Sequence, residues 1–379
     1  MEAIAAQIKE LHAQAGEEGR RKILNDLGEL QASLDTDWDT VLKLAGGPLQ
    51  LALVKIGVDL DIFRFLNEHP RTFAEIIKKT GVASDLLGRI LRGQASFGLI
   101  KEIGSDKFGA SRLTTLFSDS NVSGAIEYVF DVLRPIAHTF PGFLKDRKGG
   151  QGITSTQDTV FQRAFNTDLG GLDWMNQHPE TFGNLFKFLA LRPNHTWVEA
   201  FPIEEEVVSF NDSNKAVLVD VGGGTGDQAV VFRDKFPHLA GRIIVQETPT
   251  TLTLAKPLEG IEFRAHDCFK PQPVRGAKFY YLRYVLHLWQ DAECIEVLKA
   301  LIPALSPSSL VLIDEVVVPD VNVPWQAACQ SILMSTALAG AERTLSEWRK
   351  LCDEAGFKIV DIFTYDSNMQ SVIMIVPKN

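Results

Sequence analysis

Val217-Leu-Val-Asp-Val-Gly-Gly-Gly-Thr-Gly226 is the stretch of this chain that decides its fold. Apolar and β-branched residues surround Asp220, so the segment predicts a buried strand, and the glycines after it predict a tight turn at the strand's carboxyl end. Open α/β sheets bind their ligands at this end, where glycine lets the backbone approach the ligand closely. The stretch therefore predicts a ligand site at the edge of a doubly wound sheet.

A second predicted strand, Arg242–Glu247, ends in an acid roughly 20 residues after the turn, the spacing at which a carboxylate meets ribose hydroxyls. The turn lacks the G-x-G-x-x-G pattern that opens a helix in dinucleotide sites. Asp-Val-Gly-Gly-Gly-x-Gly instead resembles the S-adenosylmethionine turn of class I methyltransferases. That cofactor has no pyrophosphate to cap a helix, so the turn need only admit adenosine and the methionine tail.

Composition restricts the partners of the chain. Its 379 residues suffice for two domains, 45% of them are hydrophobic, and no apolar run suggests a membrane span. A net charge of −10 argues against nucleic acid, because a phosphate backbone needs a basic surface. Four widely spaced cysteines and an acidic, amphipathic amino terminus indicate reduced thiols and no secretory signal. We expect a cytoplasmic protein with a small-molecule substrate and no membrane or nucleic-acid partner.

Residues 1–120 predict a helical, winged-helix-like dimerisation domain. The presumed recognition helix carries only Arg89 and Arg92 among apolar residues, so a buried or dimer-forming role is favoured over DNA binding. The amino-terminal helices present more apolar surface than a lone appendage could bury, which predicts a homodimer. The expected helices span 1–45, 49–66, 73–79 and 85–96, and the expected wing pairs 99–103 with 107–110.

Residues 121–200 predict a helical segment that forms the substrate pocket. From residue 201 to residue 379 the pattern changes to alternating strands and helices, which predicts an α/β domain. The expected strands are Val217–Val221, Arg242–Glu247, Ile261–Ala265, Phe279–Leu286, Leu310–Val316, Ile359–Thr364 and Ser371–Val376. Seven strands ending in a hairpin are typical of the Rossmann-like, doubly wound methyltransferase sheet.

The whole chain resembles the plant and fungal small-molecule O-methyltransferases, especially the fungal branch and its pericyclase-like relatives. Six motifs carry this resemblance in order along the carboxyl-terminal half. They are Val219-Asp-Val-Gly-Gly-Gly-Thr-Gly226, Gly241-Arg-Ile-Ile-Val-Gln-Glu247, Ala265-His-Asp-Cys-Phe269, Tyr281-Leu-Arg-Tyr-Val-Leu-His-Leu-Trp289, Ile313-Asp-Glu315 and Glu342-Arg-Thr344. The resemblance implies S-adenosylmethionine as cofactor and an amino-terminal dimerisation domain.

The resemblance assigns the cofactor contacts by motif. In the family the glycine turn cradles the methionine part, here Gly222 and Gly224, and the acid after the second strand holds the ribose. That acid is usually aspartate and is Glu247 here, whose longer arm can still reach two hydroxyls.

Three further residues complete the implied cofactor site. The acid after the third strand meets the adenine amine, here Asp267 with Cys268 alongside, and a basic residue four before the catalytic histidine lies near the cofactor, here Arg283. Asp267 has a simpler interpretation as a helix N-cap or the first residue of an Asx turn, because Asp-Cys-Phe follows a strand.

The resemblance places the general base at His287 and the acids that orient it at Glu315 and Glu342. A phenol with a pKa of about 10 is mostly protonated at neutral pH, so methyl transfer to it needs a base. The alternatives are a structural histidine in a strand-to-helix turn and, for Glu342, a surface ion pair with Arg343. No His/Cys/Asp cluster has metal-ligand spacing in the sequence, so we expect no metal.

Two departures leave other functions open. The family usually has Asp after the catalytic histidine, where this chain has Leu288, and His138 lies in the segment expected to cover the substrate. Some fungal relatives keep the fold but catalyse pericyclic reactions or dehydrations, so a pericyclase or dehydratase is the alternative enzyme, and a winged-helix regulator is the non-enzymatic one. The expected substrate contacts are His138, Phe130, Trp174, Met175, Met334 and Leu338.

Overall fold

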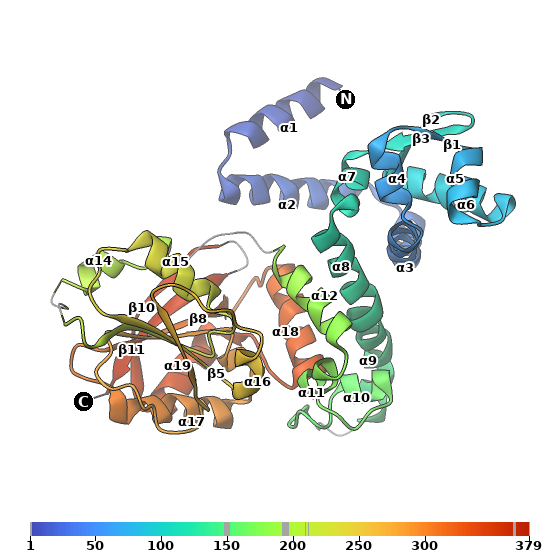
Figure 1. The fold of residues 1–379 in the computed structure, drawn as a ribbon. Coiled ribbons are helices and arrows are strands. Elements are labelled where there is room, and N and C mark those ends of the chain that lie inside the picture. The colour runs from blue at the N-terminus through green and yellow to red at the C-terminus, as the bar shows by residue number, and fades with distance from the viewer. Residues whose placement is uncertain are drawn as a thin grey trace. The chain divides into compact units, whose positions relative to one another are not determined.

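The computed structural model describes residues 2–147, 152–191, 197–208, 210, 212–366 and 369–378. The chain forms two compact units, each with its own hydrophobic core (Figure 1). The first unit comprises Met1–His138 and Asp173–Pro193, and the second comprises Thr139–Leu172 and Asn194–Asn379. The segment predicted to form the substrate pocket is therefore divided between the two units.

The first unit is helical with a small antiparallel wing, as predicted. The wing strands are ordered β1-β3-β2, and they pack with α3, α4 and α6 around buried side chains such as Leu53, Phe63 and Leu91. The elements are α1 (Glu2–Gln14), α2 (Glu17–Leu34), α3 (Asp37–Asp59), α4 (Ile62–Glu68), β1 (Arg71–Thr72), α5 (Phe73–Thr80), α6 (Ser84–Ser96), β2 (Ile100–Gly104), β3 (Lys107–Ala110), α7 (Arg112–Ser118), α8 (Ser120–Tyr128), the π-helix η1 (Val129–Leu133) and α12 (Pro179–Leu189). Two helices, α9 (Arg134–Asp146) and α11 (Gly171–Asn176), pass from one unit to the other.

The amino-terminal helices leave large apolar side chains in solvent. Helix α1 buries none of its residues, and Leu11, Leu34 and Trp38 are 58%, 76% and 68% exposed. Among the described residues α3 is long and apolar enough to cross a membrane by length and composition alone, which the sequence analysis did not anticipate. Its first turn carries Asp37 and Asp39 and its last residue is Asp59. This surface is available for an interface.

The second unit is built on a mixed sheet ordered β10-β11-β8-β7-β4-β5-β6, with the two-residue β9 pairing beside β8. Strands β4 to β8 pair in parallel, whereas β11 pairs antiparallel with both β8 and β10. The arrangement confirms the predicted seven-stranded sheet with a terminal hairpin. The elements are α10 (Val160–Phe165), α13 (Trp197–Ala200), α14 (Ile203–Glu206), β4 (Ala216–Val221), α15 (Asp227–Lys235), β5 (Arg242–Glu247), α16 (Pro249–Leu252), β6 (Ile261–Ala265), β7 (Phe279–Arg283), η2 (Leu286–Leu288), α17 (Asp291–Leu301), η3 (Ile302–Ala304), β8 (Leu310–Val318), α18 (Trp325–Leu338), β9 (Arg343–Thr344), α19 (Leu345–Glu354), β10 (Phe357–Thr364) and β11 (Gln370–Pro377).

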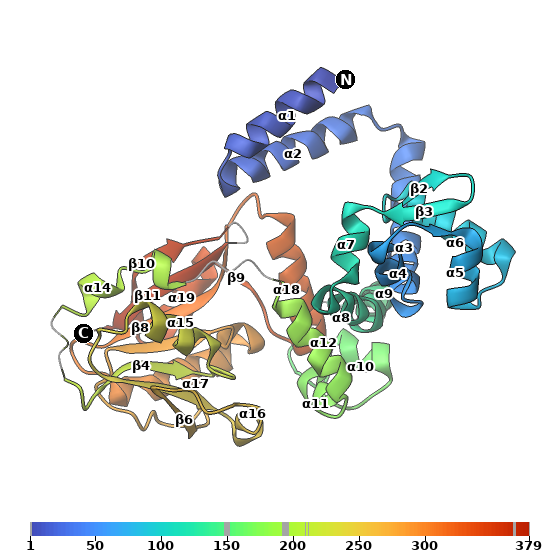
Figure 2. The ribbon, with the colours of Figure 1, turned by 45° about the horizontal axis from the view of Figure 1, so that its top comes forward.

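Helices cover both faces of this sheet (Figure 1, Figure 2). On one face, α17 and α19 bury Leu298 and Trp348 against the strands. On the other face, α13 and α15 bury Trp197 and Phe232, whose rings stack 5.8 Å apart. Every residue of β4 is buried, as expected for a central parallel strand covered on both sides. The site residues at the strand ends therefore stand on a rigid base.

Strand β7 is shorter than predicted. The expected strand ran to Leu286, but β7 ends at Arg283 because Tyr284 takes a left-handed φ of 52° and Leu286–Leu288 forms a 3-10 turn. The strand pattern of alternating apolar residues continues through these positions and conceals the break. As a result His287 lies on a turn at the carboxyl edge of the sheet.

Candidate active site

The glycine turn after β4 has a backbone conformation and close contacts that disfavour side chains. Gly222, Gly224 and Gly226 have positive φ values of 75°, 58° and 91°, which L side chains rarely adopt. The backbone N–H of Gly222 donates to the carbonyl of Gln246 at 2.8 Å, which ties the turn to β5. A Cβ atom on Gly223 would lie 2.4 Å from the Asp220 carboxyl carbon. The turn is a backbone cradle of the kind predicted for a cofactor.

Two buried ionisable groups beside this turn lack complete hydrogen bonding. Asp220 is 1% exposed and its Oδ2 atom has no hydrogen-bond partner among the described residues. Burial raises the pKa of Asp220 to about 7, while the charge of Arg283 opposes the rise. The Nη1 atom of Arg283 makes no hydrogen bond within the described chain and lies 3.4 Å from Oδ2 of Asp314. Such polar atoms fit a zwitterionic ligand part at this edge.

The acids predicted to hold ribose and adenine lie at the same edge. Glu247 ends β5, and its carboxylate accepts a hydrogen bond from the N–H of Thr248 at 2.5 Å. Asp267 is exposed after β6 and its Oδ1 accepts from the N–H of Phe269 at 3.0 Å, so the Asx-turn interpretation is also correct. Cys268 is half-buried, and burial raises the pKa of its thiol to about 11. The carboxyl ends of β4, β5, β6 and β7 thus bring together the predicted cofactor residues.

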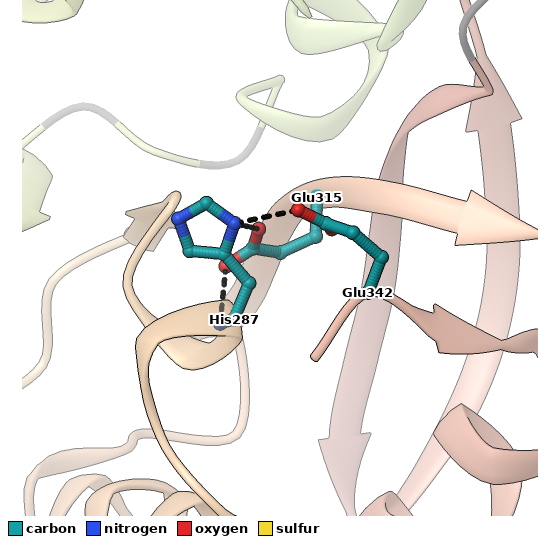
Figure 3. Close-up of side chains that lie close together, drawn as sticks. All are labelled: His287, Glu315 and Glu342. Carbon is teal, nitrogen blue, oxygen red and sulfur yellow. Dashed lines mark hydrogen bonds and ion pairs between the residues drawn. The ribbon is translucent and has the colours of Figure 1, made fainter. Parts of the chain in front are cut away.

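The residues predicted for catalysis form one buried cluster (Figure 3). His287, Glu315 and Glu342 are 6%, 0% and 5% exposed. The Nδ1 atom of His287 lies 2.8 Å from Oε1 of Glu342 and 3.8 Å from Oε2 of Glu315. Oε1 of Glu315 accepts the backbone N–H groups of Leu286 and His287 at 2.9 and 3.3 Å. One acid therefore binds the imidazole and the other binds the turn that carries it.

This geometry determines which histidine nitrogen can accept a proton. A carboxylate only accepts hydrogen bonds, so the Nδ1 atom of His287 carries the proton that faces Glu342. The second ring nitrogen, Nε2, points away from both acids (Figure 3). Burial raises the pKa of Glu315 to about 7, with the charge of Glu342 adding to the rise and that of His287 opposing it. The cluster is arranged to stabilise an imidazolium formed by protonation at Nε2.

Arg343, interpreted from sequence as a possible surface ion-pair partner of Glu342, is a buried clamp on this turn. It is 2% exposed and donates to the carbonyl oxygens of Leu286 at 3.1 Å and Trp289 at 2.7 Å. Its Nε atom also donates to Oδ1 of Asp291 at 2.8 Å. The surface ion-pair interpretation is wrong, because the guanidinium binds the backbone on both sides of the catalytic histidine.

Two further residues of this site were missed from sequence. Gln330 on α18 donates from Nε2 to Oε1 of Glu342 at 2.7 Å, so it fixes the acid that orients His287. Gly340 lies so close to the catalytic turn that a Cβ atom there would be 1.9 Å from the carbonyl oxygen of His287. The Glu342 motif predicted the acid but neither of these two contacts, since Gln330 and Gly340 have no distinctive spacing.

The predicted substrate contacts are divided between the units. In the first unit, Phe130 lies on η1 and is partly buried, His138 on α9 is exposed, Met175 is 3% exposed, and Trp174 stacks on the ring of His178 at 3.7 Å. In the second unit, Met334 and Leu338 are partly buried on α18. Their role as substrate contacts stays a prediction.

The ligand atoms of His287, Glu315 and Glu342 lie within 4.8 Å of one another, which is close enough to hold a metal ion. The geometry alone therefore permits a metal that the sequence did not predict. Oε1 of Glu342 already accepts hydrogen bonds from His287 and Gln330. These bonds orient the histidine as a base without a metal.

Comparison with known proteins gives consistent matches. A profile of an O-methyltransferase domain matches residues 189–358. O-methyltransferase okaF of Penicillium ochrochloron is 64% identical over 100% of both chains. Demethylsterigmatocystin 6-O-methyltransferase of Aspergillus parasiticus is 47% identical over 100% of this chain and 98% of that protein. The solved structure of LepI in complex with SAM has a TM-score of 0.91 at 32% identity and covers 100% of this chain and 98% of its own.

Proposed function

Because the chain belongs to the family of S-adenosylmethionine-dependent O-methyltransferases, we propose that it methylates a hydroxyl group of an aromatic natural product with His287 as general base. Its enzyme class, its cofactor and its place in fungal secondary metabolism follow from the family. The observation that carries the proposed mechanism is the hydrogen bond from His287 Nδ1 to Glu342, which turns Nε2 away from both acids.

The residues at the strand ends fit S-adenosylmethionine. The turn from Gly222 to Gly226 offers a cradle without side chains, and Arg283 and Asp220 offer buried polar atoms beside it. Glu247 would hold the ribose, and Asp267 with Cys268 would lie at the adenine. When bound, the sulfonium supplies a methyl group that is already activated for displacement, so positioning supplies much of the rate.

His287 does the proton chemistry in this proposal. Its Nε2 atom takes the proton of the acceptor hydroxyl as the oxygen becomes the nucleophile. The imidazolium that results is stabilised at Nδ1 by Glu342 and at longer range by Glu315. Leu288, in place of the usual aspartate, leaves this network intact because both acids come from other elements.

The relatives suggest the acceptor class. The Aspergillus parasiticus relative acts by name on the 6-oxygen of demethylsterigmatocystin. We propose a comparable aromatic hydroxyl of a polyketide- or alkaloid-type metabolite, and demethylsterigmatocystin is the first acceptor to try. Within the unit that carries His287, Met334 and Leu338 on α18 would supply contacts to it.

A pericyclase or dehydratase remains the second candidate, since one solved neighbour with a TM-score of 0.91 is described as a pericyclic reaction enzyme. The exposed His138 is the observation that motivates it. The complete His287–Glu342 pair favours methyl transfer, because a base oriented by a carboxylate is what a phenol requires.

We further propose a cytoplasmic homodimer. The four cysteines are free thiols, which suits a reducing compartment. The exposed apolar side chains of α1–α3 suit an interface with a second copy. Sedimentation equilibrium tests the dimer, and a monomer at micromolar concentration would contradict it.

The function is tested by product mass. Purified protein is incubated with demethylsterigmatocystin, and separately with metabolite extract from a source strain lacking the gene, in the presence of S-adenosylmethionine or S-adenosylhomocysteine. A product heavier by one methylene, formed only with S-adenosylmethionine, supports the proposal. A product of unchanged mass, or one lighter by water, would replace it with the pericyclase or dehydratase.

A further inference from the structure

Tyr284 has a backbone conformation that bulky residues rarely adopt. Its φ of 52° lies in the left-handed region, where a side chain crowds the backbone. The residue directly follows β7 and lies three residues before His287 in the sequence. Strained residues of this kind persist where the surrounding structure holds them, and they gather at functional sites. The strain at Tyr284 therefore indicates that neighbouring residues hold it and that the position serves the site.

Hydrogen bonds to described residues of neighbouring strands hold Tyr284. Its backbone N–H donates to the carbonyl oxygen of Asp314 at 3.3 Å, and its hydroxyl donates to Oε1 of Gln370 at 2.7 Å. Gln370 is buried, and its amide donates in turn to Oδ1 of Asp314 at 2.7 Å. Because Asp314 and Gln370 lie on the paired strands β8 and β11, the position of the Tyr284 ring is fixed by the centre of the sheet.

The ring held in this way packs against the catalytic histidine. The ring centroids of Tyr284 and His287 are 5.1 Å apart and the ring planes are inclined by 33°. The guanidinium of Arg283 lies 5.2 Å from the centroid of the same tyrosine ring. Glu342 holds the imidazole of His287 at Nδ1. The tyrosine ring packed against the imidazole restricts its rotation about this hydrogen bond. An aromatic face also attracts a cation, so it favours the protonated imidazole.

From this geometry we infer that Tyr284 is a positioning residue for methyl transfer, which orients the imidazole of His287 and stabilises its protonated form. The inference rests on the proposed role of His287 as general base. Among the described residues, the charged groups beside the imidazole include Glu315 on β8 and Glu342 before β9, Arg343 binds the carbonyls of the same turn, and Arg283 on β7 packs on the tyrosine ring. Substitution of the tyrosine ring keeps the contacts of Glu315, Glu342 and Arg343 and removes the ring against which Arg283 packs, so a change in the proton affinity of the imidazole reports on the ring together with the cation packed on it.

The test follows the titration of His287 directly. Protein labelled with ¹³C at histidine Cε1 is titrated by NMR, and the signal of His287 is assigned by its loss in His287→Gln. Tyr284→Leu, which removes the ring, is expected to lower the midpoint of this signal by about half a pH unit. Tyr284→Phe keeps the ring and is expected to keep the wild-type midpoint. If Tyr284→Leu does not yield folded protein, Tyr284→Met removes the ring in the same way.

A matched control separates positioning from stability. Tyr280→Phe, on the preceding strand β7, removes hydroxyl bonds to the carbonyls of Val274 and Ala304, so it should lower the melting temperature without moving the His287 midpoint. With demethylsterigmatocystin as acceptor, Tyr284→Leu should also lower kcat about fivefold with little change in KM for S-adenosylmethionine. An unchanged midpoint in Tyr284→Leu, or an equal shift in Tyr284→Phe, would overturn the inference. Absence of methyl transfer by the wild-type protein would instead refute the proposed function. The two outcomes are distinguishable, because the NMR titration needs no acceptor.

Discussion

The Nδ1 atom of His287 lies 2.8 Å from Oε1 of Glu342, although the two residues are 55 positions apart in the chain. The contact brings the turn after β7 against the segment before β9, and Arg343 reinforces it by binding the carbonyl oxygens of Leu286 and Trp289. The orientation of the base therefore depends on residues that never touch the reacting atoms. The predictions below test this dependence.

Gly340→Ala is expected to lower kcat about a hundredfold, because its Cβ would lie 1.9 Å from the carbonyl oxygen of His287 and the catalytic turn must move. Steady-state kinetics with S-adenosylmethionine and demethylsterigmatocystin measures the effect. Gly183→Ala is the control, since its Cβ meets nothing within 4 Å, and it should leave kcat unchanged while stabilising α12 by about 0.5–1 kcal/mol. A fully active Gly340→Ala enzyme would show that the turn tolerates displacement.

Arg343→Lys keeps the charge but cannot bind two carbonyl oxygens and Asp291 at once. Because the carbonyls are buried, each lost partner costs about 1–3 kcal/mol, and we expect both a lower melting temperature and a kcat reduced by at least about tenfold. Asp291→Asn removes only the partner that is 60% exposed, so its effect should be small. Equal effects in the two variants would contradict the clamp.

These contacts show where prediction from sequence succeeds and where it does not. The glycine turn, Glu247, Asp267 and the His287 cluster follow from motifs whose order along parallel strands places them at one edge of the sheet. The roles of Arg343 and Gly340 do not follow, because they depend on how closely the segment before β9 approaches the turn. The end of β7 at Tyr284 was missed because its apolar pattern continues through the break.

Glu315→Gln should change the pH dependence of stability. Burial raises the pKa of Glu315 to about 7 in the folded protein, above the usual value of 4.5, so the folded state holds this proton more tightly than the unfolded state. This group therefore stabilises the fold at low pH, and the contribution is lost as pH rises from about 4.5 to about 7. The melting temperature of Glu315→Gln relative to wild type should rise over that window and stay constant above it. A difference independent of pH, measured by calorimetry, would show that Glu315 is ionised throughout.

Chelation should leave the enzyme active. Although His287, Glu315 and Glu342 could hold a metal ion, the account requires Nδ1 to be bound by Glu342. Treatment with EDTA followed by gel filtration is expected to preserve kcat, and added zinc is expected to inhibit by competing for the imidazole. Activity that disappears on chelation and returns with a divalent ion would assign the cluster to a metal.

The central claim is tested most directly by His287→Ala, measured for both methyl transfer and cofactor binding. The account predicts that methyl transfer to demethylsterigmatocystin, or to the acceptor found in extract, falls at least about a hundredfold. It also predicts that the Kd for S-adenosylmethionine by calorimetry stays within about twofold of wild type, because the predicted cofactor contacts do not include the His287 side chain. Methyl transfer at the wild-type rate in His287→Ala would contradict the role of this histidine as the base.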